Sequence, residues 1–269
     1  MKKIVAIVQA RMGSERLPGK SLKKICGIPM LEHIINRIST SRKIHNIIIA
    51  TSNNIKDRPI INLSKKLSIP YYAGSEDDVL ERFIGAVESV STDAEIARET
   101  IHESSSGQGS GQDSAQAIVV RICGDNPLID IGYLDEMIDS HLSKKAEYTY
   151  NYSPIPIGTA GEVINYDVLK KLKSIAKDKR YREHVTTYIL DHLNEFNVNC
   201  TKPPPYLEGR SFRFTVDTEE DLSLIRKIYR RLYSEGKIIE TSQAISLLES
   251  NHPLSKINIH ISQKDWRVK

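Results

Sequence analysis

Four short apolar segments constrain the fold of this chain more than any other feature of its sequence. Residues 4–8, 47–51 and 117–123 are rich in β-branched residues, and residues 70–73 form a shorter run. Continuous apolar runs are typical of parallel strands that are covered on both faces. Because segments with helical spacing alternate with these runs, the sequence predicts an α/β fold: a Rossmann-like, mostly parallel sheet with helices on both faces.

Apolar periodicity predicts helices in both halves of the chain. The expected helices of the first half cover residues 29–38, 55–67 and 77–89. The second half is less regular, with an extended linker expected over residues 148–156 and strands over 162–164 and 212–216. Further helices are expected over residues 166–175, 183–193, 219–233 and 241–249, whereas residues 256–269 are not assigned.

One segment has the composition of a flexible loop. Residues 104–114 read SSSGQGSGQDS and contain no apolar side chain, so they cannot contribute to a core. They fall within a predicted flexible insertion, residues 91–116, that separates a helix from the fourth predicted strand. A tolerated surface insertion is the simpler interpretation, and a lid over the site is the alternative.

Charge and cysteine content exclude several classes of function. The 38 Lys and Arg residues barely exceed the 34 Asp and Glu residues, and the resulting net charge of +4 does not predict a nucleic-acid partner. Cys26, Cys123 and Cys200 lie far apart, form no zinc motif and fit a reduced, cytoplasmic setting. The apolar run at residues 4–8 is too short for a signal peptide or a membrane span, so no membrane partner is expected.

A cationic loop follows the first predicted strand. Ligands of open α/β sheets bind at the carboxyl ends of strands, and residues 11–20 and the turn at 124–127 both occupy such ends. Arg11, Arg16 and Lys20 carry the charges that neutralise a triphosphate. The loop is neither a Walker A nor a GxGxxG motif, so a solvated basic loop is the alternative interpretation of these charges alone.

This loop is part of a larger pattern that resembles the sugar-activating cytidylyltransferases. Residues 9–20 read QARMGSERLPGK, and further stretches match the family in order along nearly the whole chain. These stretches are residues 27–30, 74–80, 121–130, 182–186 and 216–222. The family includes the 3-deoxy-manno-octulosonate and acylneuraminate cytidylyltransferases, and the opening loop looks closest to the branch of spore-coat polysaccharide biosynthesis.

The resemblance implies a fold, a reaction and a division of the chain. The fold would be nucleotide-diphospho-sugar transferase-like with a small extension from the second half, in one domain over residues 1–269. Residues 1–130 would bind the nucleotide, and residues 131–269 would bind the sugar and form a homodimer. The implied reaction joins CTP to a free 2-keto sugar acid and yields pyrophosphate and a CMP-sugar for surface polysaccharide biosynthesis, with Mg²⁺ as cofactor.

The resemblance also implies roles for individual residues. Arg11 and Lys20 would hold the triphosphate and stabilise charge at the α-phosphate, with Asp125 as the third catalytic residue. Asp125 and Asp217 would bind Mg²⁺, which prefers a few carboxylates together with phosphate oxygens and water. The residues expected near the nucleotide are Ala10, Arg11, Met12, Gly13, Ser14, Arg16, Lys20, Ser75 and Asp125.

Simpler interpretations remain open for several of these positions. Asp125 is also a common turn residue, and Asp217 fits the N-cap of the helix that follows it. Arg213 lies two alternations before Asp217, so both side chains are expected on one face, where Arg213 either meets a substrate anion or is a surface arginine. Three further residues are expected to contact the sugar, with packing or capping as the alternative: Glu162, Glu183 and His184.

Other function classes are less consistent with the sequence. A glycosyltransferase of related fold usually carries an Asp-x-Asp pair, whereas residues 125–127 read Asp-Asn-Pro. A sugar-phosphate nucleotidyltransferase that uses UTP or GTP usually has a more glycine-rich opening loop. A nucleotide-sensing or assembly subunit would retain the fold without turnover, and binding without pyrophosphate release would identify it.

Overall fold

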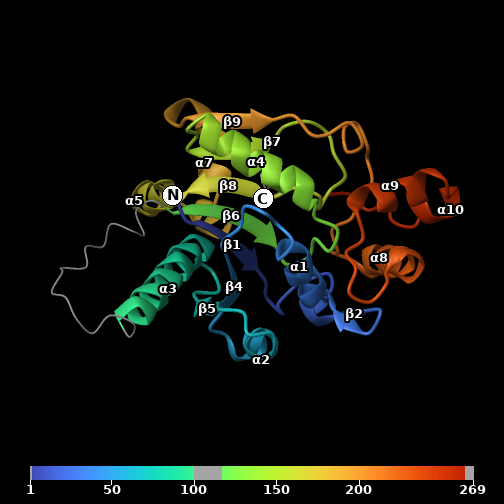
Figure 1. The fold of residues 1–269 in the computed structure, drawn as a ribbon, viewed down its shortest axis with the longest axis horizontal. Coiled ribbons are helices and arrows are strands. Elements are labelled where there is room, and N and C mark those ends of the chain that lie inside the picture. The colour runs from blue at the N-terminus through green and yellow to red at the C-terminus, as the bar shows by residue number, and fades with distance from the viewer. Residues whose placement is uncertain (1, 100–116, 264–269) are drawn as a thin grey trace.

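The fold is built on a twisted, mostly parallel sheet (Figure 1). The computed structural model describes residues 2–99 and 117–263. Within them a seven-stranded sheet has the order β5-β4-β1-β6-β8-β7-β9, and only β8 runs antiparallel to its neighbours. The strands are β1 (Ile4–Gln9), β4 (Asn46–Ser52), β5 (Tyr71–Gly74), β6 (Ile118–Cys123), β7 (Tyr148–Asn151), β8 (Glu162–Asn165) and β9 (Val198–Thr201).

Helices cover both faces of this sheet, as the sequence predicts. One face is covered by α1 (Met30–Ile38), α2 (Arg58–Lys66) and α4 (Ile131–Ser143). Helices α8 (Glu219–Leu232) and α9 (Thr241–Glu249) belong to the same buried cluster and lie beyond the ends of the strands (Figure 1). The other face contacts α3 (Val79–Glu99), α5 (Tyr166–Ile175) and α7 (Thr187–Asp191). The described elements also include the short helices α6 (Lys179–Glu183) and α10 (His252–Ser255) and the hairpin β2 (Lys24–Ile25)–β3 (Ile28–Pro29). Three 3-10 helices complete them: η1 (Lys20–Leu22), η2 (Ile55–Asp57) and η4 (Leu193–Glu195).

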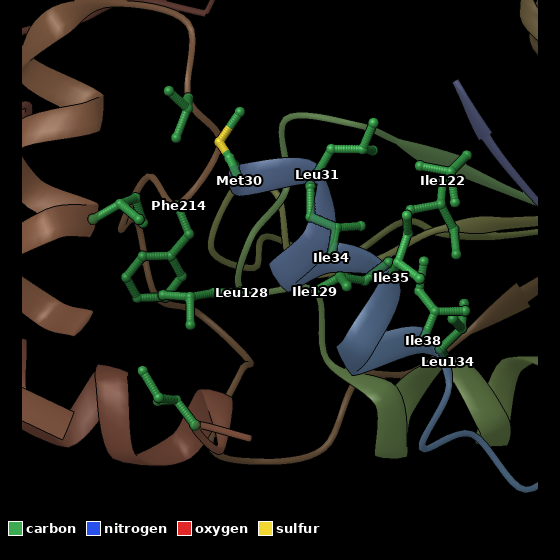
Figure 2. Close-up of a cluster of buried hydrophobic side chains, with 14 of the residues drawn as sticks. Met30, Leu31, Ile34, Ile35, Ile38, Ile122, Leu128, Ile129, Leu134 and Phe214 are labelled. Carbon is green, nitrogen blue, oxygen red and sulfur yellow. The ribbon is translucent and has the colours of Figure 1, made fainter. Parts of the chain in front are cut away.

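Helix α1 shows how the apolar pattern directs packing. Its residues Leu31, Ile34 and Ile38 recur at helical spacing and are fully buried. They face Ile122 at the end of β6 and Leu134 of α4, with Phe214 at the far side of the same cluster (Figure 2). Burial of one such side chain stabilises the fold by about 1.5–3 kcal/mol, so this cluster fixes the C-terminal helices against the sheet.

Three predicted elements of the second half are wrong. Residues 148–156 begin with β7, because alternating tyrosines suit a strand and the prolines come only after it. The helix predicted over 183–193 is broken between α6 and α7, where Thr186 directs its hydroxyl to Glu162. Residues 212–216 form a single bridge to Ile157 instead of a strand.

The predicted insertion is only partly visible. Helix α3 continues to Glu99, so the first residues of the range 91–116 are helical. The remainder, which includes residues 104–114, lies outside the described residues. In the described part of the chain, no helix is long and apolar enough to cross a membrane.

Candidate functional site

The two loops predicted to converge do meet at the carboxyl edge of the sheet. The Gly124 amide donates to the Gln9 carbonyl over 2.8 Å, which joins the turn after β6 to the end of β1. A Cβ at Gly124 would lie 2.8 Å from the same carbonyl oxygen and 2.9 Å from the Cβ of Ala10. This close approach requires glycine and explains why the turn begins with it.

A buried carboxylate anchors the cationic loop. Asp57 Oδ1 accepts the Met12 amide over 2.7 Å, while Asp57 Oδ2 accepts the Ser52 amide over 3.1 Å at the end of β4. Gly19 has a φ of 70°, and its amide donates to the Met12 carbonyl over 2.9 Å. The sequence interpretation missed Asp57, because nothing local distinguishes it from an ordinary acidic residue before a helix.

Lys20 lies between the two predicted metal ligands. Its Nζ is 2.6 Å from Asp125 Oδ2 and 2.8 Å from Asp217 Oδ1. The Val216 amide donates to the Asp125 carbonyl over 2.8 Å, which fixes the two acidic segments side by side. Lys20, Asp125 and Asp217, which lie far apart in sequence, therefore form one charged cluster at the end of the cationic loop.

The charges of this cluster stabilise one another. Burial by itself lowers the pKa of Lys20, but the nearby carboxylates of Asp125 and Asp217 outweigh it and the net pKa is raised. Burial likewise raises the pKa of Asp217, but Lys20, Arg16 and Arg213 outweigh it and the net pKa is lowered. Lys20 and Asp217 thus keep their charges across the neutral pH range.

The carboxylate pair fits a Mg²⁺ site. Asp125 and Asp217 already converge on a single cation, the Lys20 ammonium, and offer only oxygen donors. Residues 2–99 and 117–263 contain no cluster of three or more His, Cys, Asp or Glu side chains arranged to hold a metal. Mg²⁺ is commonly held by one or two carboxylates with the substrate phosphates and water, so two are sufficient.

Asp217 is not the cap of the following helix. Thr218 caps α8: its hydroxyl accepts the Asp221 amide over 3.2 Å, and Asp221 Oδ2 accepts the Thr218 amide over 3.0 Å. This reciprocal pair is a capping box. The capping alternative for Asp217 is therefore wrong, and its carboxylate is available to Lys20 and Arg16.

Arg213 meets Asp217, as the alternation of residues 213–217 predicts, although the segment is not a strand. Arg213 is only 4% exposed, and its guanidinium lies 2.5 Å from Asp217 and 3.0 Å from the buried Asp221. It also donates to Gln263. The surface-arginine alternative is therefore wrong. Through these contacts Arg213 holds the Asp217 side chain in position.

Glu162 forms a second polar cluster next to β6. Its carboxylate pairs with Arg121 and accepts the hydroxyls of Tyr148 and, over 2.9 Å, Thr186. Burial by itself raises the pKa of Glu162, but Arg121 outweighs it and the net pKa is lowered. The other two sugar-side candidates, Glu183 and His184, lie at the end of α6, shortly before Thr186.

Removal of this carboxylate charge should destabilise the fold. Glu162 and Arg121 side chains are only 19% and 20% exposed, so Glu162→Gln leaves a largely buried guanidinium without its counter-charge. We expect the free energy of unfolding in urea to fall by about 2–4 kcal/mol. The control is Asp139→Asn, which breaks an exposed pair with Lys43 and should cost less than about 1 kcal/mol. Equal small losses in both variants would contradict the structural role of Glu162.

The loop after β5 lies against the cationic loop. Glu76 Oε1 is 3.6 Å from the position that a Cβ of Gly13 would take, and Glu76 Oε2 accepts the Asn54 side chain over 2.7 Å. Ser75 Oγ accepts the Asp78 amide over 3.0 Å, and the Asp78 carboxylate pairs with Arg182. This brings Ser75 to the site and links it to the second half of the chain.

The remaining nucleotide-side residues line the same loop. Ala10 is buried, whereas Met12 and Ser14 are partly exposed. Arg16 is exposed and lies 3.3 Å from Asp217. Within the part of the chain that the structure describes, Arg11 makes no hydrogen bond or ion pair, so its charge is available to a ligand.

Comparison with known proteins gives one consistent family. The cytidylyltransferase family model matches residues 5–245. The chain is 32% identical to the spore coat polysaccharide biosynthesis protein SpsF of Bacillus subtilis, over 93% of this chain and 96% of that protein. It is 34% identical to an uncharacterized protein of Methanocaldococcus jannaschii, over 98% of both chains. It is also 31% identical to the 3-deoxy-manno-octulosonate cytidylyltransferase of Geobacter sulfurreducens, over 50% of this chain and 44% of that enzyme.

Solved structures share the fold. A cytidylyltransferase from Leptospira borgpetersenii superimposes with a TM-score of 0.80 at 24% identity, covering 95% of this chain and 98% of that one. A CMP:2-keto-3-deoxy-manno-octonic acid synthetase complexed with CTP gives a TM-score of 0.58 at 14% identity, covering 86% and 99%. The predicted nucleotide-diphospho-sugar transferase-like architecture is thereby confirmed.

Proposed function

The chain belongs to the cytidylyltransferase family and is a nucleotidyltransferase, and from this premise we propose that it transfers CMP from CTP to a free sugar. The hydroxyl oxygen of the sugar forms a bond to the α-phosphorus and gives up its proton to water, the bond from that phosphorus to the β-phosphate oxygen breaks, and pyrophosphate leaves. The observation that carries the proposal is the convergence of Asp125, Asp217 and Lys20 beside the cationic loop.

Each residue of the site has a physical role in this proposal. Arg11, Arg16 and Lys20 bind the phosphate oxygens and offset the charge that develops as pyrophosphate departs. Buried Arg213 and the capping box of α8 hold Asp217 in position. The amides of the loop after Ala10 are oriented by Asp57 and Gly19, which limits the reorganisation needed on binding.

Asp125 and Asp217 are the residues that would hold Mg²⁺. When bound, the ion would neutralise phosphate charge and polarise the α-phosphate. Lys20 now shares both carboxylates and would turn toward the phosphates as they arrive.

The proposed acceptor is a 2-keto sugar acid for surface polysaccharide biosynthesis. The name of one relative, a spore coat polysaccharide biosynthesis protein, supports the role in surface polysaccharide biosynthesis. The name of another supports the acceptor class, because 3-deoxy-manno-octulosonate is such an acid. The proposal further places the enzyme in the cytoplasm and has it act as a homodimer through its second half.

A thermal-shift panel tests the nucleotide. CTP, UTP, GTP and ATP are each added with and without Mg²⁺, and a ligand that binds only the folded state must raise Tm. We expect a shift for CTP alone, larger with Mg²⁺, and pyrophosphate release when sugar acids are then screened. A shift only for another triphosphate would contradict the proposal. A shift only for a nucleotide sugar would favour a glycosyltransferase, and CTP binding without release for any acceptor would favour a sensor.

A further inference from the structure

One fully buried charge among the described residues has a single hydrogen-bond partner for its guanidinium. Arg82, in the first turn of α3, is 0% exposed. Its Nη1 donates to the Ser75 carbonyl over 2.7 Å. Its Nε and Nη2 have no hydrogen-bond partner, and it forms no ion pair with any residue that the structure describes. Nearly all buried donors in proteins are satisfied, so this side chain requires an explanation.

The neighbouring carboxylates all serve other groups. Asp78 pairs with Arg182, Glu76 accepts Asn54, and Asp57 accepts the amides of the cationic loop and β4. None of them lies within ion-pair distance of Arg82. The guanidinium is therefore a buried positive charge without an ion pair among the described residues, and Asp57, Glu76 and Asp78 act on it only from a longer distance, which is a costly arrangement.

A second buried arginine, in contrast, has a hydrogen-bond acceptor for each nitrogen of its guanidinium. Arg37 of α1 is 3% exposed, and it donates to the carbonyls of Ile129 and Ile239 and to the Thr241 hydroxyl. All of its donor nitrogens are in use. The fold can therefore satisfy a buried guanidinium, and it does not do so at Arg82.

Arg82 lies beside the loop after β5, which carries Ser75 of the proposed nucleotide site. Its Cγ is 3.3 Å from the position that a Cβ of Gly74 would take, at the start of the loop that carries Ser75. Burial, followed by the positive charge of Arg11, lowers the pKa of Arg82 to about 10, and the more distant carboxylates of Asp57, Glu76 and Asp78 offset this only in part. The positive charges of Arg11 and Arg82 thus repel each other, and neither side chain forms an ion pair within the described residues. Repulsion between like charges favours an anion between or beside them.

We propose that Arg82 is a positioning residue of the nucleotide site, whose guanidinium holds the Ser75 carbonyl and supplies a buried charge that the triphosphate of a bound nucleotide compensates. The charge destabilises the free protein and strengthens binding of the anionic ligand. This inference rests on the proposed CTP-dependent function.

The test compares Arg82→Met with Arg37→Met. Methionine fills much of the same volume without charge, so Arg82→Met should have a Tm that is not lower than wild type. Its Kd for CTP, measured by calorimetry, should rise about tenfold, and the CTP-induced increase in Tm should shrink. Arg37→Met should show the reverse: Tm falls by roughly 5 °C or more, because three acceptors lose their donor, while CTP affinity is retained.

Arg82→Lys separates charge from packing. It retains the positive charge, so it should bind CTP more tightly than Arg82→Met does. Arg82→Met with a lowered Tm and unchanged Kd for CTP would overturn the proposal and make Arg82 a structural residue. An equal increase in the Kd for CTP in Arg82→Lys and Arg82→Met would contradict the proposal that the positive charge of Arg82 strengthens CTP binding. If the wild-type protein does not bind CTP, this result contradicts the proposed function itself, and the role proposed for Arg82 is then contradicted as well.

Discussion

Asp125→Asn should reduce kcat for pyrophosphate release by about 1,000-fold or more, because a neutral amide is a poor Mg²⁺ ligand and several kcal/mol of charge stabilisation would be lost. The affinity for CTP should change little. Arg11, Arg16 and Lys20 remain, and Lys20 keeps its contact with Asp217. Steady-state kinetics at saturating Mg²⁺ give kcat, and calorimetry gives the Kd for CTP.

A surface variant provides the control for this substitution. Asp139→Asn makes the same chemical change on an exposed part of α4, where Asp139 pairs with Lys43 over 2.7 Å, and it should keep wild-type kcat. Turnover at the wild-type rate by Asp125→Asn would contradict the proposal that Asp125 binds Mg²⁺. Loss of CTP binding together with turnover would instead give Asp125 a role in binding.

Lys20→Met should lower kcat/KM for CTP by about 100- to 1,000-fold, since a preorganised charge at the reacting phosphates would be absent. The size of this expected loss depends on the surroundings of Lys20 as well as on its charge. Lys20 is held by two carboxylates and its side chain is only 13% exposed, so no nearby side chain can replace it without moving. Removal also takes from Asp125 its ion-pair partner among the described residues, whereas Asp217 keeps Arg16 and Arg213, so the position of Asp125 should become less fixed.

Lys23→Met is the matched control for the lysine. Lys23 follows closely in sequence, and its Nζ lies 3.0 Å from Glu219 in an exposed pair. Its loss should change kcat/KM by less than about threefold, because exposed pairs contribute little. Comparable activity losses in both variants would indicate a general effect of positive charge on this surface, and not a specific role for Lys20.

The chemistry of the opening loop is local, so its interpretation could be made from sequence alone and stays a prediction. Residues 9–20 carry their glycines and cations together, so the sequence alone pointed to phosphate binding. Asp125 and Asp217 were predicted through the resemblance, and the structure does bring both to Lys20. Asp57, Arg121 and Arg82 were missed, because each becomes informative only through a partner, or a missing partner, elsewhere in the fold.

Apolar periodicity by itself determined the parallel core of this protein. The runs that became β1, β4, β5 and β6 and the helices that cover them follow from burial on one or both faces, which each segment encodes locally. The second half followed this rule less well, because β7 and the break between α6 and α7 depend on pairing with β8 and on the hydroxyl of Thr186.

Only the tertiary structure decided which charges are paired. Arg213 forms ion pairs with Asp217 and Asp221, whereas Arg82 is buried without an ion pair among the described residues, and neither local sequence reveals this difference. The physical reason is that the stability of a charge depends on its partners and its exposure to water, and both are set by residues distant in sequence.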